Sequence, residues 1–422
     1  MRILYVSHYF PPEMGAPAGR VAGLARLWAR AGHEVHVLTG FPHHPTGRIH
    51  PEYRRKFLRG FVREEFGGAQ VHRTWIFPAA NKGKVLRSLN YFSFMASAVV
   101  NGSLAIPRPD VVVATSPQLL CAGAGALLSR RWRVPFVMEV RDLWPESLVA
   151  VGASHLQSPL VRVLEGIARR LYSSASHLVT VTEAQRAAIV AGGIPAAQVS
   201  VIPNGVDEEF LRSVEELQMP RSDSFVVTYI GTLGMAHHLE TLLEAAQRLR
   251  HDRGIRFRLV GEGARRAALE AQARAMGLDN VEFAGERPRE EVPRWIAESS
   301  ACLVLLRKTG VFTTVVPSKM LEIMAVGRPI VLGVRGEASA LLERAGAGIA
   351  IEPENADLLV AALAALRGDQ DRCRQLGENG RQFIRREFLR ESLAQRYLHL
   401  LATLTHPSAA LAAKPQPASE SQ

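Results

Sequence analysis

The chain has 422 residues, 47% of them hydrophobic, which is too many for a single core and suits two domains of roughly 180–200 residues. Three widely spaced cysteines exclude a disulfide framework and a cysteine-based zinc site, and they fit a reducing, cytosolic compartment. The formal net charge of +11 lies entirely in the first half, because residues 1–185 hold 22 Lys and Arg against 11 Asp and Glu, whereas residues 186–422 hold 29 of each.

The one-sided charge predicts an anionic partner for the first half alone: membrane phospholipid, a lipid diphosphate or a nucleic acid. Residues 48–63 and 82–95 place basic side chains beside aromatic ones, which suits an anionic bilayer surface but also occurs on ordinary charged faces. No nucleic-acid-binding motif accompanies them, so we expect no nucleic-acid partner. We expect neither a signal peptide nor a transmembrane helix, because the chain opens on a strand-like run and its most apolar stretch, 89–106, is too polar. The expectation is a cytoplasmic protein bound peripherally to the inner membrane.

Apolar runs alternate with helical patterns along the first half, which predicts a parallel sheet wrapped by helices. The expected strands are 3–7, 34–39, 110–114, 134–140 and 177–181. Gly15 and Gly19 lie in the loop after the first strand, ahead of a helix that contains Val21 and Trp28. Ligands of such sheets bind beyond the carboxyl ends of the strands, so polar residues at these ends are candidates for the acceptor side. They are His8, Arg141, Asp142 and Glu146.

The second half repeats the alternation and therefore predicts a second doubly wound parallel sheet. Its expected strands are 225–230, 257–260, 281–285, 301–306, 330–332 and 346–351. The Pro-Asn-Gly turn at 203–205 suits a hinge between the halves. Helices are expected at 355–366 and 370–402, and the polar tail is expected to be disordered. We assign a first domain to 1–185, a second domain to 186–385, a C-terminal helix to 386–405 and a disordered tail to 406–422.

The stretch from Pro317 to Ile330 places a lysine and a glutamate three residues apart at the start of an apolar helical run. Lys319 and Glu322 then share one face of the helix. Ser318 is the expected N-cap, and the free amides of the first turn would suit an anion. A cation with a carboxylate one turn deeper meets the needs of a nucleoside diphosphate, although an ordinary amphipathic helix with a solvated Lys/Glu pair has the same pattern.

Five short motifs occur in one order along the second half, and together they are far more specific than any one of them. They are 204–207 (Asn-Gly-Val-Asp), 231–234 (Gly-Thr-Leu-Gly), 261–263 (Gly-Glu-Gly), 283–285 (Phe-Ala-Gly) and 317–329. With these motifs, residues 1–400 resemble the retaining glycosyltransferases of family 4, and the 141–147 segment looks most similar to bacterial transferases of amino sugars for O-antigen and capsule. The resemblance implies the GT-B fold, in which two Rossmann-like α/β domains face a cleft and a C-terminal helix returns to the first domain.

The resemblance also implies where a nucleotide-sugar donor would lie. Glu322 matches the carboxylate that holds the donor ribose, Lys319 would hold the diphosphate with backbone amides of glycines, and the turn at 285–287 matches the base site. Lys319 and Asp142 are the candidate catalytic residues. The leaving diphosphate is thought to take the acceptor proton, and neither a metal nor another cofactor is implied. The full expected donor-binding set is Gly15, Gly19, Gly231, Gly234, Gly261, Gly285, Glu286, Arg287, Arg307, Lys308, Ser318, Lys319 and Glu322.

The chain departs from the family pattern at three positions. The family's first glutamate, eight positions before Glu322, is Thr314 here, and the common Arg and Lys of the loop after the domain's first strand are Thr232 and His237. Diphosphate binding would then fall on Arg307, Lys308 or Lys319, and the altered donor pocket fits an unusual deoxy or amino sugar. The Asp-x-Asp at 369–371 is expected to be structural.

These observations predict a retaining glycosyltransferase that moves a sugar from a nucleoside diphosphate, most often UDP, to a lipid-linked saccharide. Its place would be bacterial surface polysaccharide biosynthesis, such as that of lipopolysaccharide O-antigen or capsule. A sugar-nucleotide epimerase of GT-B architecture is the main alternative, and it would need acid and base groups near the sugar. A basic nucleic-acid-binding protein is a third reading that leaves the neutral second half unexplained.

Overall fold

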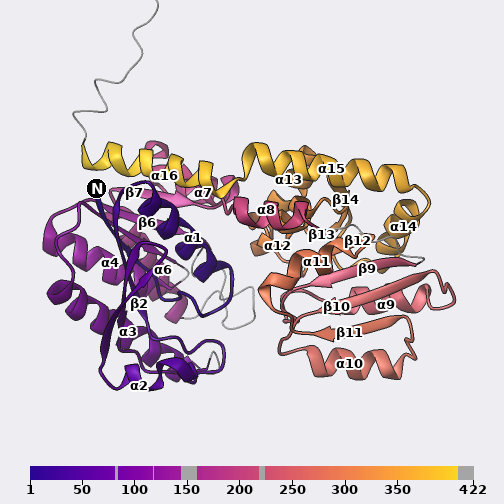
Figure 1. Ribbon diagram of the computed structural model, residues 1–422, viewed down its shortest axis with the longest axis horizontal. Helices are drawn as coiled ribbons and strands as arrows, with labels where there is room; N and C mark the ends of the chain where they lie inside the picture. The colour runs from indigo at the N-terminus through magenta and orange to yellow at the C-terminus, as the bar shows by residue number, and fades with distance from the viewer. Residues whose placement is uncertain (81–83, 117, 144–158, 218–223, 407–422) are drawn as a thin grey trace, which may run out of the picture.

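The computed structural model describes residues 1–80, 84–116, 118–143, 159–217 and 224–406 (Figure 1). Two α/β domains lie side by side along the long axis, and each is built around its own sheet. This arrangement confirms the predicted fold class of two doubly wound domains. The tail predicted to be disordered falls almost entirely outside the described residues.

The first sheet has eight strands in the order β3-β4-β2-β1-β5-β6-β7-β8, and only the edge pair β3–β4 is antiparallel. Its central strands are nearly continuous apolar runs because helices cover both faces of the sheet. The strands are β1 (Arg2–Val6), β2 (Glu34–Gly40), β3 (Phe61–Phe66), β4 (Ala69–Thr74), β5 (Val111–Thr115), β6 (Phe136–Val140), β7 (His177–Thr180) and β8 (Val199–Val201).

Side chains of β1 alternate between the two faces of this sheet, as the pleat of a strand requires. Leu4 and Val6 pack with α3 and α4, whereas Ile3 and Tyr5 pack with α1 and the C-terminal helix α16. The helical segments of this domain are α1 (Ala16–Arg30), η1 (Pro51–Tyr53), α2 (Arg54–Phe57), α3 (Lys84–Ala105), α4 (Leu119–Trp132), α6 (Pro159–Ser174), α7 (Glu183–Ala191) and η2 (Ala196–Gln198).

The second sheet has six parallel strands in the order β11-β10-β9-β12-β13-β14. The strands are β9 (Phe225–Ile230), β10 (Ile255–Val260), β11 (Val281–Gly285), β12 (Ala301–Leu305), β13 (Ile330–Gly333) and β14 (Gly348–Ala350). The surrounding helical segments are α8 (Glu208–Glu215), α9 (Glu240–Arg248), α10 (Arg266–Ala275), η3 (Arg289–Glu291), α11 (Val292–Ala297), η4 (Gly310–Thr314), α12 (Ser318–Val326), α13 (Glu337–Ala345) and α14 (Ala356–Arg367).

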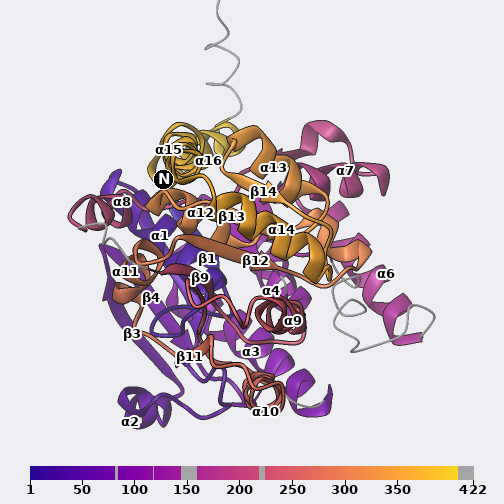
Figure 2. The same cartoon turned by 90° about the vertical axis from the view of Figure 1, so that its right-hand side faces the viewer.

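Two C-terminal helices, α15 (Gln370–Glu387) and α16 (Arg390–Thr405), join the domains along one side of the molecule. They nearly overlap in Figure 2 because both run close to the long axis. The indole of Trp28 in α1 donates a hydrogen bond to the Ala394 carbonyl (3.3 Å) and meets the Tyr397 ring edge to face. The C-terminal helix therefore returns to the first domain as predicted, although the single helix expected at 370–402 is in fact two. Asp369 caps α15 by accepting from the Arg372 amide, which confirms the structural role of the Asp-x-Asp.

Two sequence-based assignments in the first domain need correction. The predicted boundary at residue 185 falls inside α7, and β8 still pairs with β7, so the first sheet extends to Val201. A strand of only three residues carries too little periodicity to be recognised from sequence. Residues 61–74, considered only in part and as basic surface, form the antiparallel β3–β4 hairpin at the sheet edge.

Candidate active site

Three glycines meet at the carboxyl ends of β9, β10 and β11, the edge that points toward the first domain (Figure 1). Gly231, Gly261 and Gly285 all have positive φ, and the amide of Gly261 donates to the carbonyl of Gly285 (2.8 Å). A Cβ on Gly261 would lie 2.0 Å from the Gly231 carbonyl oxygen. Only glycine allows this close backbone approach, so the structure brings these three predicted donor-binding residues together.

Lys319 projects from the first turn of α12 onto this glycine edge. Its Nζ lies 2.9 Å from the Tyr229 hydroxyl and 4.0 Å from the centre of the Tyr229 ring. A Cβ on Gly231 would lie 2.6 Å from the same Nζ, so the ammonium sits directly against the backbone there. Burial lowers the pKa of Lys319 to about 7, and the nearby Glu322 partly opposes this shift.

The two residues that replace the family's Arg and Lys offer no compensating charge. Gly234 precedes His237 in a turn closed by the His237 amide and the Gly234 carbonyl (3.3 Å). Burial, and secondly the Lys319 ammonium, lower the pKa of His237 to about 4, so this imidazole is neutral near pH 7. Thr232 is uncharged. Lys319 therefore supplies the positive charge beside Gly231, whereas Arg266, which lies beside Gly285, pairs with Glu262 and Glu270.

Glu322 lies one helical turn after Lys319 and pairs with an arginine that the sequence did not indicate. Arg289, at the start of η3, donates to both carboxylate oxygens of Glu322 (2.9 and 2.5 Å). Its guanidinium also lies 5.8 Å from the centre of the Phe210 ring. The separation of 33 positions between the two partners carries no spacing signal, although Arg289 follows the predicted base-binding turn by only two positions.

The predicted cap of α12 is wrong by one residue. Pro317 is the N-cap, Ser318 is the first helical residue, and no side chain caps this end. The Met320 amide donates to the Pro317 carbonyl (3.0 Å), whereas the amides of Ser318 and Lys319 have no side-chain cap, which keeps these two available to an anion. Gly327 ends the helix in the left-handed region, as the sequence pattern indicates.

The remaining predicted donor-side residues are spread around the glycine edge. The Arg307 amide donates to the Ala236 carbonyl (2.8 Å), which ties the end of β12 to the loop after β9. Lys308 pairs with Glu352 (2.8 Å), so its charge is already engaged. The Arg287 guanidinium lies over the Trp295 ring, and Glu286 is exposed beside it.

Gly15 and Gly19 lie at the amino end of α1 in the first domain. Gly15 is the N-cap with φ 128°, and a Cβ on Gly19 would meet open space. The Gly19 carbonyl accepts a hydrogen bond from Arg390, which links this end of α1 to the start of α16. Thr314, which replaces the family's first glutamate, uses its carbonyl to accept from the Thr182 hydroxyl of α7 (2.8 Å) and so contacts the first domain.

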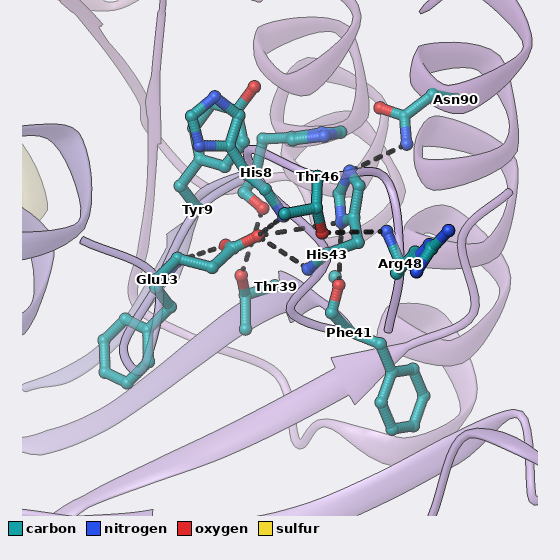
Figure 3. Close-up of polar contacts among 12 residues, drawn as sticks. His8, Tyr9, Glu13, Thr39, Phe41, His43, Thr46, Arg48 and Asn90 are labelled. Carbon is teal, nitrogen blue, oxygen red and sulfur yellow. Dashed lines mark hydrogen bonds and ion pairs between the residues drawn. The ribbon is translucent and has the colours of Figure 1, made fainter. Parts of the chain in front are cut away.

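Glu13 organises the first-domain loops at the carboxyl ends of β1 and β2 (Figure 3). One carboxylate oxygen accepts from the amides of His43 and His44, both at 2.9 Å, and the other accepts from the Phe10 amide (3.4 Å). Asn90 of α3 approaches the His43 ring (2.9 Å) from the other side. Burial raises the pKa of Glu13, and the three amides oppose that shift. Glu13 could not be predicted from the sequence, since a single loop glutamate has no distinguishing pattern.

His8, a predicted acceptor-side residue, is buried next to this cluster (Figure 3). The rings of Tyr9, His43, Tyr91 and Phe94 surround it, and neither ring nitrogen has a hydrogen-bond partner within the described part of the chain. Burial lowers the pKa of His8 well below its ordinary value. His8 is consequently neutral near pH 7.

Arg141 and Asp142 follow β6, separated from the end of β1 by the single strand β5. Arg141 is buried, and its Nε and Nη1 have no partner among the residues that the structure describes. Burial lowers the pKa of Arg141 and raises that of Asp142. Two of the predicted acceptor-side residues therefore share one sheet edge with His8, while Glu146 lies outside the described residues.

A buried ion pair connects this edge to the hinge. Glu139, at the end of β6, accepts from Tyr5, Thr115 and Arg20 side chains, each at 3.0 Å. Arg20 also donates to the carbonyls of Ile202 and Pro203 at the hinge (2.9 and 2.6 Å). The position of the hinge relative to the first sheet is thus set by one arginine of α1.

Among the described residues, no cluster of three or more His, Cys, Asp or Glu side chains has the geometry to hold a metal ion. Within the same ranges, no helix combines the length and apolarity that crossing a bilayer requires.

The family of the chain follows from comparison with known proteins. The Glycosyl transferase 4-like domain model matches residues 15–205, and the Glycosyl transferases group 1 model matches residues 215–383. Together with the two facing sheets, these matches define a GT-B glycosyltransferase. The chain belongs to glycosyltransferase family 4.

Relatives and solved structures agree with this assignment. The chain is 27% identical over 383 residues to the putative colanic acid biosynthesis glycosyl transferase WcaI of Escherichia coli K12, covering 86% of this chain and 91% of that protein. It is 26% identical over 424 residues to the MMP alpha-(1->4)-mannosyltransferase of Mycolicibacterium hassiacum, with 93% and 96% coverage. Anabaena HepE, solved in complex with UDP and glucose, has the same fold with a TM-score of 0.69 at 19% identity, covering 96% of this chain and all of that one.

Proposed function

We propose that the enzyme transfers a sugar, with retention, from a nucleoside diphosphate bound to the second domain. The main support for this proposal is the position of the Lys319 ammonium against Gly231, at the carboxyl edge of the second sheet. Glu322, one turn further along α12, would accept from the ribose hydroxyls, in addition to or in place of Arg289, which donates to its carboxylate in the free enzyme. HepE was solved with UDP-glucose, which supports a UDP-sugar as the donor class.

Transfer requires the bond between the anomeric carbon and the diphosphate to break while a bond to an acceptor hydroxyl forms on the same face. Lys319 and the free amides of α12 would stabilise the negative charge that develops on the leaving diphosphate. The acceptor proton would pass to that diphosphate. His8, Arg141 and Asp142, at the facing edge of the first sheet, would position the sugar and the acceptor.

The proposed acceptor is a lipid-linked saccharide of bacterial surface polysaccharide biosynthesis. One relative carries a name from this area, the putative colanic acid biosynthesis glycosyl transferase WcaI. The excess of basic residues in the first half supports a place at the inner membrane surface. A deoxy or N-acetylamino sugar would suit the donor site, in which Thr314 replaces the family's first glutamate.

The donor class can be identified by thermal stability. We expect one nucleotide sugar of a panel with UDP, GDP and dTDP carriers to raise the melting temperature, because a ligand stabilises the folded state by mass action. Glu322→Ala should lose this shift, whereas Glu378→Ala, an exposed change on α15, should retain it. A panel in which no nucleotide sugar stabilises the wild-type enzyme would contradict the proposal.

Product analysis separates a transferase from an epimerase. With the identified donor and no acceptor, a transferase leaves the sugar configuration unchanged in NMR spectra, apart from slow hydrolysis. An epimerase would produce a second nucleotide sugar under the same conditions, and that outcome would replace the proposed activity.

Donor affinity should depend on pH through Lys319. The protonated amine attracts the diphosphate, so the donor affinity is highest below about pH 7, which is the pKa of Lys319 in the free enzyme. The affinity decreases as the pH rises above this value. The affinity should fall by up to about tenfold per pH unit until the pKa of the bound form is reached. Calorimetry of a nucleotide sugar in buffers with different ionisation enthalpies should detect proton uptake near pH 7–8. Lys319→Arg should bind without this dependence, because arginine stays charged.

A further inference from the structure

Helix α3 presents an apolar face to solvent on the outside of the first domain. Its inner face is buried through Asn90, Phe94, Ala98 and Gly102. The large apolar side chains of the outer face are between 48% and 80% exposed. They are Val85, Leu86, Leu89, Phe92, Val100 and Leu104, and the small Ala96 is exposed among them. A solvent-facing helix of a soluble domain is normally polar on this side, so the exposed stripe indicates an interaction surface.

Neighbouring elements extend the stripe into a wider surface. Trp75, after β4, is 41% exposed, stacks on Phe57 of α2 and accepts at its carbonyl from the Ser97 hydroxyl of α3. On the other side of α3, Leu128 of α4 lies close to Gly102, and its neighbour Leu127 is exposed. We call the outer faces of α2, α3 and α4, with Leu58 and Trp75, the α3 surface.

The charged side chains of α2, α3 and α4 are all basic, although Lys56 pairs with Glu64 of β3 (3.7 Å) and Glu52 is exposed just before α2. The sequences of α2, α3 and α4 contain no aspartate or glutamate. Their described basic residues are Arg54, Arg55, Lys56, Arg87, Arg130 and Arg131. Apolar side chains bordered by Lys and Arg match the boundary between acyl chains and anionic headgroups.

The sequence predicted a basic and aromatic membrane surface at residues 48–63 and 82–95, and only some of their apolar side chains are exposed, among them Leu58, Leu89 and Phe92. Tyr53 and Phe94 are buried in the core, and Phe57, Tyr91 and Met95 are partly buried against it. Position relative to the sheet decides which side of α3 is exposed, and that position depends on the packing of α3 against β1, β2 and α4.

We propose that the α3 surface inserts into the interfacial region of an anionic bilayer, with the stripe among the acyl chains and the flanking Arg and Lys at the headgroups. The first turns of α3 also reach the cleft-facing loops, because Asn90 contacts His43 and Tyr91 packs on His8. Insertion would therefore hold the acceptor side of the cleft next to the membrane. That consequence rests on the proposed function, whereas insertion itself does not.

Vesicle sedimentation tests the insertion without donor or acceptor. Full-length protein should bind vesicles of equal parts phosphatidylglycerol and phosphatidylcholine, and bind pure phosphatidylcholine more weakly. Leu89→Ser/Phe92→Ser should weaken binding to the anionic vesicles by at least about tenfold, because two large side chains no longer enter the acyl region. The matched control is Leu358→Ser on α14, a similarly exposed leucine of the second domain, which should bind as the wild type does. Arg54→Gln/Arg55→Gln should reduce the difference between the two vesicle types.

The depth to which the α3 surface enters the bilayer can be measured directly by fluorescence quenching. Phe92→Trp should be quenched by brominated acyl chains, and Leu358→Trp should not. Wild-type protein that stays in the supernatant, or a Leu89→Ser/Phe92→Ser variant that binds as tightly as wild type, would overturn the proposal. So would a wild-type dimer that this variant converts to monomers, since a second copy would then cover the surface. Stabilisation by nucleotide sugars in the same variants reports on the donor site separately.

Discussion

Lys319→Ala is expected to reduce the rate of sugar transfer by about 10²–10³-fold, the usual loss when a donor to a developing negative charge is removed from a water-excluded site. The reason is local: Thr232 is uncharged and His237 is neutral, so neither can replace the positive charge of Lys319 beside Gly231. The measurement is kcat/KM for donor consumption in the presence of acceptor. The fold should be retained, because the Tyr229 hydroxyl keeps the Thr232 carbonyl as its acceptor (2.8 Å) when the ammonium is removed.

Two variants make this result specific. Lys319→Arg should recover part of the lost rate, because the positive charge remains while its geometry changes. Arg374→Ala, which removes an exposed cation from α15, should leave the rate unchanged. A Lys319→Ala enzyme with a rate within twofold of wild type would show that the diphosphate is stabilised elsewhere, with Arg307 as the first residue to examine.

Arg20→Ala is expected to lower the free energy of unfolding by about 3–5 kcal/mol, the usual cost of removing one partner from a buried ion pair. Glu139 is fully buried, and without Arg20 it would keep only the Tyr5 and Thr115 hydroxyls. The hinge carbonyls of Ile202 and Pro203 would lose their donor as well. Urea denaturation of the first domain, followed by near-UV circular dichroism, should show the lower midpoint.

The comparison with an exposed ion pair tests the explanation. Arg212→Ala removes an i,i+4 partner of Glu208 on the surface of α8 and should cost less than about 1 kcal/mol. Arg20→Met/Glu139→Leu should recover much of the loss, because it leaves no buried charge unpaired. Equal effects of Arg20→Ala and Arg212→Ala would mean that the buried pair contributes no more than a surface pair.

The strands of the second domain could be predicted to within about two residues. The strand at 225–230 agrees with β9, because a parallel strand covered on both faces is a continuous apolar run. The strand at 281–285 agrees with β11, a partly exposed edge strand that ends at Gly285. Strands could not be recognised in this way where the apolar run was very short or where polar residues alternated with apolar ones. The three-residue strand β8 was missed, and the β3–β4 hairpin was not recognised because its exposed face carries charges.

In the candidate site, too, local features could be predicted from the sequence, whereas contacts between distant segments could not. The helix start that presents Lys319 and Glu322 depends on spacing within one turn, so it could be predicted. The partners of these residues could not. Tyr229 and Arg289 are distant in sequence, and only the parallel order of the strands brings their segments to α12. Glu13 is a comparable case, because its amide donors belong mainly to the loop after another strand.

Sequence alone determined the class of this protein: alternating strands and helices in two halves, the glycines at strand ends, and a lysine and a glutamate one turn apart. These features are local, and backbone geometry and side-chain periodicity translate them directly into structure. Tertiary structure decided which charges are paired, which polar atoms are buried without partners, and which face of α3 meets solvent. Those properties depend on contacts between segments far apart in the chain, where burial and strand order, not spacing, set the neighbours of each side chain.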